Sequence, residues 1–492
     1  MKEKFEKFFS FGFKSAFLFL MGLMVFIFSM MTGNIYISKS INLFTILISL
    51  EILILIYWFS GKIINLKIRL LIPVIIFAAA AVPRVIIVFI FHSQPFNDFL
   101  TYYSAAKMWY SGNMSFLKDF TFANFPDSLG FVKYQSLLMS VLSDNIIAFQ
   151  LFNCLITSAI CIVIYVLLKK VSHLAAVTAA IIYALFPPNI IYPTILTNQH
   201  MSTLLFFIAF YLLTFNGSSR NLKNILIKTG AAGILIGLGN LIRPEALPFV
   251  LAITIILLLR LFFSFKSLPS ISVKLVTALL PAVFLLFYFM TASAFGLYMR
   301  QYNVYSISGD LRYKIITGLS YDSQGFYRRD ISSKFFSGDD NDKNEMLKDI
   351  AYYYKNSPYK IVTLEMTKMS YQYASKDTAL LWSLGDKGQY GKEAVNFSYI
   401  QKTYEKLTVP FYFIIILLAA YGFWKRRRAS LFNIETILAL ATLVRILVYF
   451  IIEVQERYRY LDIPIFFIFG ALGMVYFMDN IKPRLKSFLF EK

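Results

Sequence analysis

Residues 70–91 have the sequence LLIPVIIFAAAAVPRVIIVFIF and are followed by HSQPFNDFLTYY at residues 92–103. The first stretch is long and apolar enough to cross a membrane as a helix, which needs about 20 residues. It nevertheless contains Arg84, and Asp98 follows a few residues beyond its end. Charged groups at such depths are costly in free energy, so both are candidates for a functional role.

Similar apolar stretches recur along the whole chain. Of its 492 residues, 58% are hydrophobic and 15% are charged, whereas soluble proteins carry about 25% charged residues. We therefore predict an all-α polytopic membrane protein with about twelve transmembrane helices. The expected helices cover residues 11–31, 42–60, 70–91, 146–168, 172–190, 198–215, 229–242, 245–264, 275–297, 407–424, 431–452 and 461–478.

Lysines and arginines cluster on alternate connections between these helices, most densely at Lys425–Arg428. Because short basic loops face the cytoplasm, we predict a multi-pass protein of the cell membrane with both termini in the cytoplasm. The net charge of +21 is then explained by topology and by anionic lipid, and it does not indicate a nucleic-acid partner.

The spans divide the chain into four regions. We expect an N-terminal helical hairpin at 1–69, a transmembrane core at 70–297 with a first outer loop at 92–145, a small and mainly α extracytoplasmic domain at 298–406, and C-terminal transmembrane helices at 407–492. Within 298–406, apolar periodicity predicts helices at Glu345–Tyr354 and Tyr359–Tyr373. A further helix at Asn396–Leu407 is expected to lead back to the membrane.

Polar and charged residues accumulate at the predicted outer ends of the helices, where they suggest a polar cavity. Arginines at such a cavity would bind a phosphate in bidentate fashion. A carboxylate would remove the proton from an acceptor hydroxyl. The residues singled out are Arg84, Asp98, Gln199, His200, Arg243, Arg445, Arg457, Tyr458 and Arg459.

Several of these residues could instead have a purely structural role. Asp98 could cap a helix at Phe99–Tyr110, and Arg243 could satisfy carbonyls at the helix break that Pro244 favours. Arg84 could pair with a neighbouring residue, and Arg445 could pair with Glu435 or Glu453. Arg457 and Arg459 could anchor the chain at the membrane interface.

Cysteine and histidine give no sign of a metal or a disulfide. Cys154 and Cys161 lie two helical turns apart, about 10 Å, which is too far for a disulfide. The three histidines are scattered and no Cys/His cluster occurs, so we do not expect a zinc site.

Five motifs follow one another in the chain: PFNDFLTYYSAA at 95–106, FPDSLGF at 125–131, LGNLIRPEA at 238–246, TGLSYDSQGF at 317–326, and ERYRY at 456–460 with Pro464 beyond it. Their order resembles that of the GT-C glycosyltransferases, in the bacterial branch akin to protein O-mannosyltransferases and lipid A aminoarabinose transferases. In that family an acid follows a membrane helix in the first outer loop, and an Arg-Pro pair breaks a later helix. The resemblance extends from about residue 80 to 480.

The resemblance implies a GT-C-like fold and an inverting transfer of a sugar from a polyprenyl-phosphate donor to a hydroxyl of an extracytoplasmic acceptor. It implies that Asp98 is the general base and that Arg457 and Arg459 bind the donor phosphate, with Arg84 and Arg243 as further candidates. The residues expected to bind substrate are Tyr102, Gln199, His200, Arg445 and Tyr458.

Two departures from the family pattern bear on the chemistry. Asn97 precedes Asp98 where some relatives have a pair of acids, so one carboxylate remains. Gln199 and His200 stand where relatives often carry a glutamate, which argues against a metal held by acids. We therefore expect no cofactor, and a divalent metal stays an alternative that the sequence does not support. The first hairpin, 11–60, looks added ahead of the core that the family shares.

The expected enzyme is a hexosyl- or pentosyltransferase whose acceptor is a cell-wall polymer, a teichoic acid, a lipid or a protein. The bias toward Lys, Ile, Asn and Phe is typical of an AT-rich bacterial genome and favours a wall polymer or teichoic acid. A polysaccharide polymerase or ligase and a non-enzymatic flippase or transporter of lipid-linked sugars remain possible. A transporter would show related halves with matching interrupted helices, and the sequence contains no clear repeat.

Overall fold

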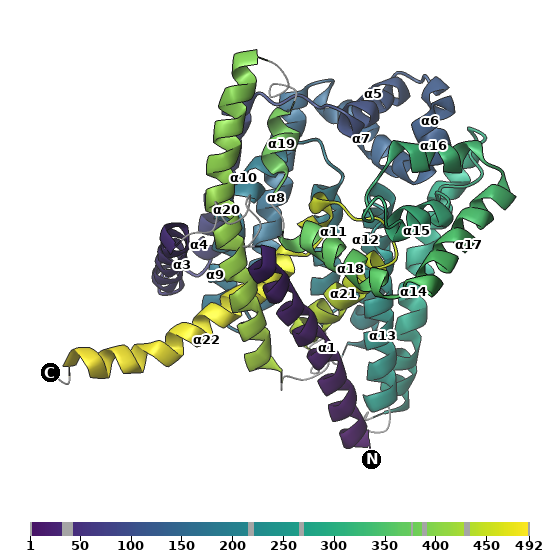
Figure 1. The fold of residues 1–492 in the computed structure, drawn as a ribbon. Coiled ribbons are helices and arrows are strands. Elements are labelled where there is room, and N and C mark those ends of the chain that lie inside the picture. The colour runs from purple at the N-terminus through teal and green to yellow at the C-terminus, as the bar shows by residue number, and fades with distance from the viewer. Residues whose placement is uncertain are drawn as a thin grey trace.

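The computed structural model describes residues 2–31, 43–214, 221–264, 270–374, 377–385, 391–427 and 433–490. Within these ranges the chain is helical and has no strand, which confirms the predicted all-α class. Figure 1 shows a bundle of long helices with a set of shorter helices at the end away from the N-terminus. Arg428, part of the basic cluster expected in the cytoplasm, lies outside the described residues.

Each of the twelve ranges predicted to cross the membrane overlaps a helix, of 13 to 36 residues. These are α1 (Lys2–Met31), α3 (Leu43–Ile64), α4 (Leu71–Phe91), α8 (Ile146–Leu168), α9 (His173–Leu185), α11 (Gln199–Leu212), α12 (Leu222–Ile242), α13 (Leu247–Ser264), α14 (Ile271–Arg300), α20 (Gly391–Arg426), α21 (Ile434–Tyr449) and α22 (Ile463–Phe490). Among the described residues, seven helices are long and apolar enough to cross a membrane: α3, α4, α8, α12, α14, α20 and α22. The chain is therefore polytopic.

One predicted span ends earlier than expected. The sequence predicts a single span over 172–190, but α9 stops at Leu185 and the chain bends by 63° into α10 (Pro187–Ile191) and η3 (Tyr192–Thr194). Pro187 and Pro188 cannot continue the hydrogen bonding of α9, which explains the break. If the bent pair counts as one span, the number of candidate spans rises to eight.

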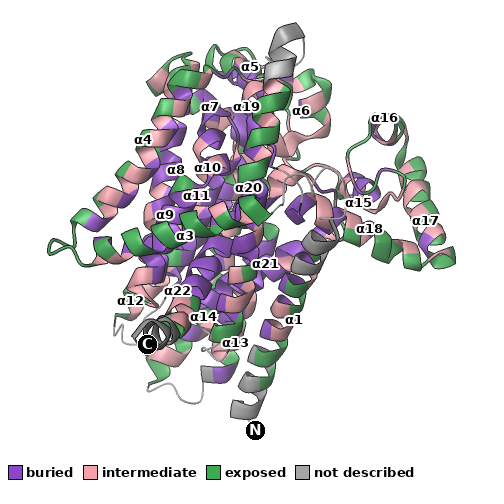
Figure 2. Ribbon diagram, turned by 60° about the vertical axis from the view of Figure 1, so that its left-hand side comes forward, coloured by how far each residue is buried: buried purple, intermediate pink, exposed green. Residues whose placement is uncertain are grey.

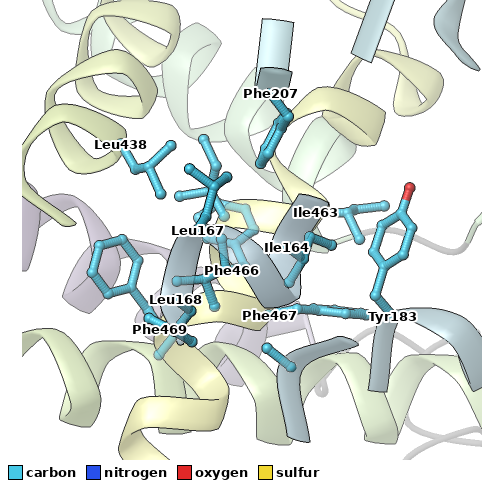
Figure 3. Packing of buried hydrophobic residues seen from close by; sticks show 14 of the residues in the cluster. Ile164, Leu167, Leu168, Tyr183, Phe207, Leu438, Ile463, Phe466, Phe467 and Phe469 are labelled. Carbon is cyan, nitrogen blue, oxygen red and sulfur yellow. The ribbon is translucent and has the colours of Figure 1, made fainter. Parts of the chain in front are cut away.

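The middle of the bundle is an apolar core. Figure 2 shows the buried residues concentrated there, and Figure 3 shows Phe467 of α22 beside Tyr183, with Phe466 near Ile164 and Phe469 near Leu168. The rings of Tyr183 and Phe467 meet edge to face at 6.1 Å. Because lipid is as apolar as these side chains, close packing rather than water exclusion holds such helices together.

Two glycines allow α20 and α22 to approach closely. A Cβ on Gly473 would lie 1.9 Å from the carbonyl oxygen of Leu418, and one on Gly422 would lie 2.2 Å from that of Phe469. Small residues at a helix crossing permit this approach of the two backbones. The contact fixes α22, which directly follows the turn η6 (Glu456–Leu461), against α20.

The shorter helices come from two segments. Segment 92–145 forms α5 (Asp98–Tyr110), α6 (Phe120–Asn124), η2 (Pro126–Ser128) and α7 (Leu129–Leu142). Segment 298–406 forms α15 (Leu311–Leu319), α16 (Arg329–Ser337), α17 (Asp340–Asn356), α18 (Tyr359–Met369), a π-helical turn (Ser370–Ala374) and α19 (Ala379–Leu384), and then enters α20. The helices predicted inside segment 298–406 are therefore confirmed.

At the N-terminus, α1 and α3 each pack against α20.

Replacing Gly473 with alanine should lower the thermal unfolding midpoint of the detergent-solubilised protein. The new Cβ would collide with the backbone of α20, and overpacking of this kind costs about 1–3 kcal/mol. Differential scanning fluorimetry measures the shift. Gly296→Ala in α14 is the matched control, because a Cβ there meets nothing within 4 Å. Equal midpoints for the two variants would contradict the packing described.

Candidate functional site

Asp98 and Arg457 meet at the end of the bundle that carries the short helices. Arg457, in η6, places Nη2 3.1 Å from Oδ2 of Asp98, although 359 positions separate the two residues. The side chain of Asp98 is 51% exposed and that of Arg457 is 14% exposed. The fold thus joins an accessible carboxylate to a largely buried guanidinium.

The start of α5 directs Asp98 toward this contact. Asn97, the residue before it, has a φ of 50° and a ψ of −128°, a positive-φ conformation that is uncommon for residues other than glycine. Asn97 is the N-cap position of α5, and Asp98 is the first helical residue. A capping role for Asp98 is therefore not supported, and its carboxylate bonds to Arg457 instead.

The guanidinium of Arg457 is held on several sides. Its carbon lies 5.5 Å from the ring centre of Phe99 and 4.9 Å from that of Trp382 in α19. Its Nε donates a 2.7 Å hydrogen bond to Gln455, and Gln199 donates to its backbone carbonyl. Nη1 has no partner among the residues that the structure describes. Arg457 is thus fixed in place with donor capacity left for a ligand.

A second ion pair lies next to this one. Lys314 of α15 donates a 2.7 Å hydrogen bond to Oε1 of Glu453, and the hydroxyl of Tyr458 donates to the same oxygen at 3.0 Å. Burial raises the pKa of Glu453, but the charge of Lys314 and the hydrogen bonds from Lys314 and Tyr458 together hold that pKa below its ordinary value. Burial lowers the pKa of Lys314, but the charges of Glu453, Tyr458 and Asp127 together with the hydrogen bond to Glu453 bring it above its ordinary value. The pair is therefore charged at neutral pH.

Tyr102 and Asp127 complete this group. Tyr102 lies one helical turn after Asp98, and burial, followed by the charge of Asp98, raises the pKa of Tyr102 to about 12. Burial also raises the pKa of Asp127 in η2, against the opposing charge of Lys314. Tyr102 is a neutral phenol at pH 7 and can both donate and accept a hydrogen bond.

Sequence reasoning missed Asp127 and Lys314. The signal for Asp127 was present, because the residue belongs to the motif at 125–131. Nothing in the sequence distinguishes Lys314 from the other lysines of segment 298–406, since only the fold brings it to Glu453.

Arg445 holds η6 from inside the bundle. Its side chain is fully buried, with Nε donating to Asp462 at 2.9 Å, Nη1 to Glu245 at 3.0 Å and Nη2 to the carbonyl of Tyr458 at 3.0 Å. These bonds link α21 to the start of α22 and to the break between α12 and α13. Removing one partner of a buried ion pair typically costs about 3–5 kcal/mol.

The partners expected for Arg445 were wrong. Glu435 pairs with Arg426 at 2.6 Å, and Glu453 pairs with Lys314. Both acids lie near Arg445 in sequence, but its actual partners come from other helix ends.

Arg243 extends the same network. It pairs with Glu245, donates a 2.8 Å hydrogen bond to Asn198, and places its guanidinium carbon 5.2 Å from the ring centre of Tyr458. These partners are side chains and not the carbonyls of the helix break.

Arg459 and Arg84 are placed away from the Asp98 contact. Arg459 forms a 3.2 Å ion pair with Asp377, and both side chains are buried. Arg84 is fully buried in α4, where Nη1 donates to the carbonyls of Ala80 and Ala184. Its Nε and Nη2 have no partner among the described residues.

His200 bridges two elements inside the core. Its Nε2 donates to the carbonyl of Tyr192 at 3.0 Å, and its Nδ1 lies 2.8 Å from the hydroxyl of Tyr460. A carbonyl only accepts hydrogen bonds, so Nε2 carries a hydrogen and the Tyr460 hydroxyl donates to Nδ1 of the neutral ring. Both ring nitrogens are thereby used within the protein.

In the described part of the chain, the side chains that could bind a metal are histidines, cysteines and acids, and those that could react as thiols are the cysteines. There, no group of three or more His, Cys, Asp or Glu residues is arranged to hold a metal ion. Cys154 and Cys161 are free and buried.

Lys368 of α18 ties the motif at 317–326 to the chain that leads into η6. Its Nζ donates 3.0 Å hydrogen bonds to the carbonyls of Gly318 and Phe450. Gly325, with a φ of +78°, lies against the aliphatic part of Lys368, and its carbonyl accepts from the amide of Val454 at 3.1 Å. The side chain of Lys368 therefore acts as a clamp over the entrance to the turn.

Replacing Lys368 with methionine should loosen residues 317–326 and 450–460 together, because two carbonyls lose their charged donor. We expect hydrogen–deuterium exchange of these two segments to rise several-fold and the exchange of α8 to stay constant. Lys348→Met, at an exposed position of α17, is the control. Unchanged exchange in both segments of the Lys368 variant would show that the clamp does not hold the turn.

The comparisons with known proteins agree with this architecture. Residues 131–290, about one third of the chain, match the family of dolichyl-phosphate-mannose-protein mannosyltransferases. The match runs from α7 to α14 and includes Gln199, His200 and Arg243, whereas Asp98 and Arg457 lie outside it. No curated protein matches the chain. Together with the polytopic helical fold, the family match over this third of the chain supports a membrane glycosyltransferase of the GT-C type in general.

Proposed function

We propose that the protein transfers a hexosyl or pentosyl residue from a polyprenyl-phosphate donor to a hydroxyl group of an acceptor, with inversion at the anomeric carbon. The observation that carries the proposal is the contact between Asp98 and Arg457. It pairs an accessible carboxylate, suited to act as a base, with a fixed guanidinium, suited to bind phosphate. The family match supports glycosyl transfer in general, and these roles are our proposal.

In the proposed reaction the acceptor oxygen attacks the anomeric carbon while Asp98 takes the hydroxyl proton. The bond between that carbon and the phosphate oxygen breaks, and polyprenyl phosphate leaves with the electron pair. Arg457 stabilises the charge that grows on the phosphate. Because the acceptor oxygen attacks from the face opposite the leaving phosphate oxygen, a single displacement inverts the configuration, and it needs one base and no carboxylate nucleophile.

The ion pair itself is suited to being opened by the donor. Asp98 is half exposed, whereas the side chain of Arg457 is 14% exposed. A donor phosphate that replaces Asp98 would keep an anionic partner on the buried guanidinium, and water would solvate the displaced carboxylate, which then becomes available as the base.

Among the four candidate arginines, the contacts favour Arg457 as the phosphate ligand. Arg459 and Arg243 are engaged by Asp377 and Glu245, and Arg84 is buried on backbone carbonyls. We assign these three to the scaffold of the site. Of the residues expected to bind substrate, Tyr102 and Tyr458 lie at the Asp98–Arg457 site, while Gln199, His200 and Arg445 position η6.

The distribution of basic residues supports the orientation proposed for the protein. Both termini would lie in the cytoplasm and the Asp98–Arg457 site on the outer side of a bacterial cell membrane. The acceptor would be a cell-surface molecule, namely a wall polymer, a teichoic acid, a lipid or a protein, and no cofactor takes part in the proposed step.

Replacing Asp98 with asparagine should lower the turnover of sugar transfer by about 100-fold or more, because general-base catalysis contributes about 10²–10⁴-fold. The measurement is transfer of label from polyprenyl-phosphate sugar by protein reconstituted in lipid. Asp119→Asn, at an exposed position of the same segment, is the matched control. Wild-type turnover in a folded Asp98 variant would rule out the assigned base, and a pure transporter would form no product in any variant.

Replacing Arg457 with lysine should raise the KM for the donor by about tenfold or more. Lysine keeps the charge but loses the planar, bidentate geometry and the contact with the two aromatic rings, so the loss is about 1.4 kcal/mol or more. Steady-state kinetics over a range of donor concentrations give the value. Arg300→Lys, at the exposed end of α14, serves as control. A donor KM equal to that of the wild type would remove Arg457 from the phosphate site.

A further inference from the structure

A cavity of about 410 Å³ lies between segment 92–145 and segment 298–406. Its walls are formed by α6 and the start of η2, by residues 303–310, and by side chains of α16 and α17. Its volume falls within the range of about 300–1,000 Å³ that is usual for ligand sites. Neither Asp98 nor Arg457 lines it, so it is a separate site from the ion pair described above.

Two contacts connect the wall of the cavity to residues that lie near the proposed base, Asp98. Phe122, which lines the cavity, has its ring centre 6.3 Å from that of Tyr102. Tyr102 lies four positions after Asp98 on α5, and residues at this spacing are neighbours on one helix face. On another wall, a Cβ at Gly309 would lie 3.9 Å from Oδ1 of Asp127. Tyr102 and Asp127 thus lie against the cavity wall and belong to the group of residues around Asp98.

The cavity offers aromatic faces together with amide and hydroxyl groups. Phe122, Phe336 and Tyr305 supply rings, and Asn124 and Ser308 supply polar atoms. The amide nitrogen of Asn124 donates to the carbonyl of Phe120, which leaves its side-chain oxygen to accept a hydrogen bond. Aromatic faces match the C–H faces of sugar rings, and amides and hydroxyls match sugar hydroxyls.

The charges around the cavity are few and balanced. Among its described lining residues only Asp310 and Lys343 are charged. Arg312 binds Asp310 through hydrogen bonds from both Nε and Nη2, and Lys343 lies 5.1 Å from the ring centre of Phe335. An anionic polymer would need a cluster of arginines or lysines. Peptides are recognised at a sheet edge, in an apolar or aromatic groove, or by an arginine cluster. The described lining residues include no strand and no arginine, so only the aromatic groove would apply here, and the assay below separates a peptide acceptor from a glycan.

We propose that this cavity is the acceptor subsite of the transferase and that it binds the terminal sugars of an uncharged glycan. The inference rests on the proposed function, and it narrows the acceptor from four classes to one. The bound glycan would present a hydroxyl to Asp98, while the donor phosphate occupies Arg457 on the other side of the reacting carbon.

Gly309 allows the subsite to be filled without altering the proposed base. A Cβ there would lie 3.7 Å from the nearest atom, the carbonyl oxygen of Asn124, so Gly309→Ala should be tolerated. Gly309→Trp should occupy the cavity and raise the KM for the acceptor by about tenfold or more, with an effect that saturating acceptor reverses. Asp98→Asn should instead lower turnover at saturating acceptor, which separates failure of the subsite from failure of the catalytic assignment.

The assay uses the full-length protein reconstituted in lipid. The donors are polyprenyl-phosphate sugars whose sugar carries a radioactive label derived from glucose. The acceptors are four fractions of the producing cells: neutral glycans, anionic polymers, lipids and peptides. Label in the neutral fraction, reduced by Gly309→Trp and retained by Gly309→Ala, supports the proposal. Label mainly in the anionic, lipid or peptide fraction, or equal acceptor KM values for both variants, would overturn it. If the wild type labels no fraction, the proposed function fails and the subsite fails with it.

Tyr305 provides a second test that does not depend on filling the cavity. Its side chain is 78% exposed at the cavity wall, so Tyr305→Ala should leave the fold intact. Loss of the ring should raise the acceptor KM several-fold, whereas Tyr305→Phe should stay within twofold of the wild type. An unchanged KM for the alanine variant would count against the subsite.

Discussion

The fully buried guanidinium of Arg445 fixes the turn on which the rest of the site depends. It pairs with Asp462 at the start of α22 and with Glu245 between α12 and α13, and it donates to the carbonyl of Tyr458 within η6. Transfer of a charge into a bundle interior is unfavourable unless partners surround it. The turn therefore has one arrangement in which all of these groups are satisfied, and that arrangement presents Arg457 to Asp98.

The opposite side of the turn is held by segment 298–406. Lys314 binds Glu453, Lys368 binds the carbonyl of Phe450, and Trp382 stacks on Arg457. Residues from distant parts of the chain thus hold one guanidinium in place before any ligand arrives. Preorganisation of this kind is the main source of electrostatic stabilisation in enzymes, because no dipoles need to be reoriented during the reaction.

The sequence predicts the helices well because apolar runs of membrane length are a strong local signal. It fails where the signal is weak or not local. The bend after Leu185 was missed because Pro187 and Pro188 lie inside an apolar run. The partners of Arg445 were assigned by proximity in sequence, whereas Glu245 lies 200 positions away.

Asp98 and Arg457 were both selected because a charge near the end of a membrane helix is unfavourable in free energy, but only the fold shows that the two side chains are in contact. Asp127, Lys314 and the cavity beside them depend on how segments 92–145 and 298–406 pack, for which the sequence has no simple pattern.

We propose that one carboxylate, Asp98, acts as the general base in a single displacement at the anomeric carbon. The stereochemistry of the product distinguishes this reaction from a two-step path. Transfer from a polyprenyl-phosphate sugar of known anomeric configuration, followed by NMR of the anomeric proton in the isolated product, should show the opposite configuration. A product with retained configuration would require a covalent or otherwise two-step path and would contradict the account.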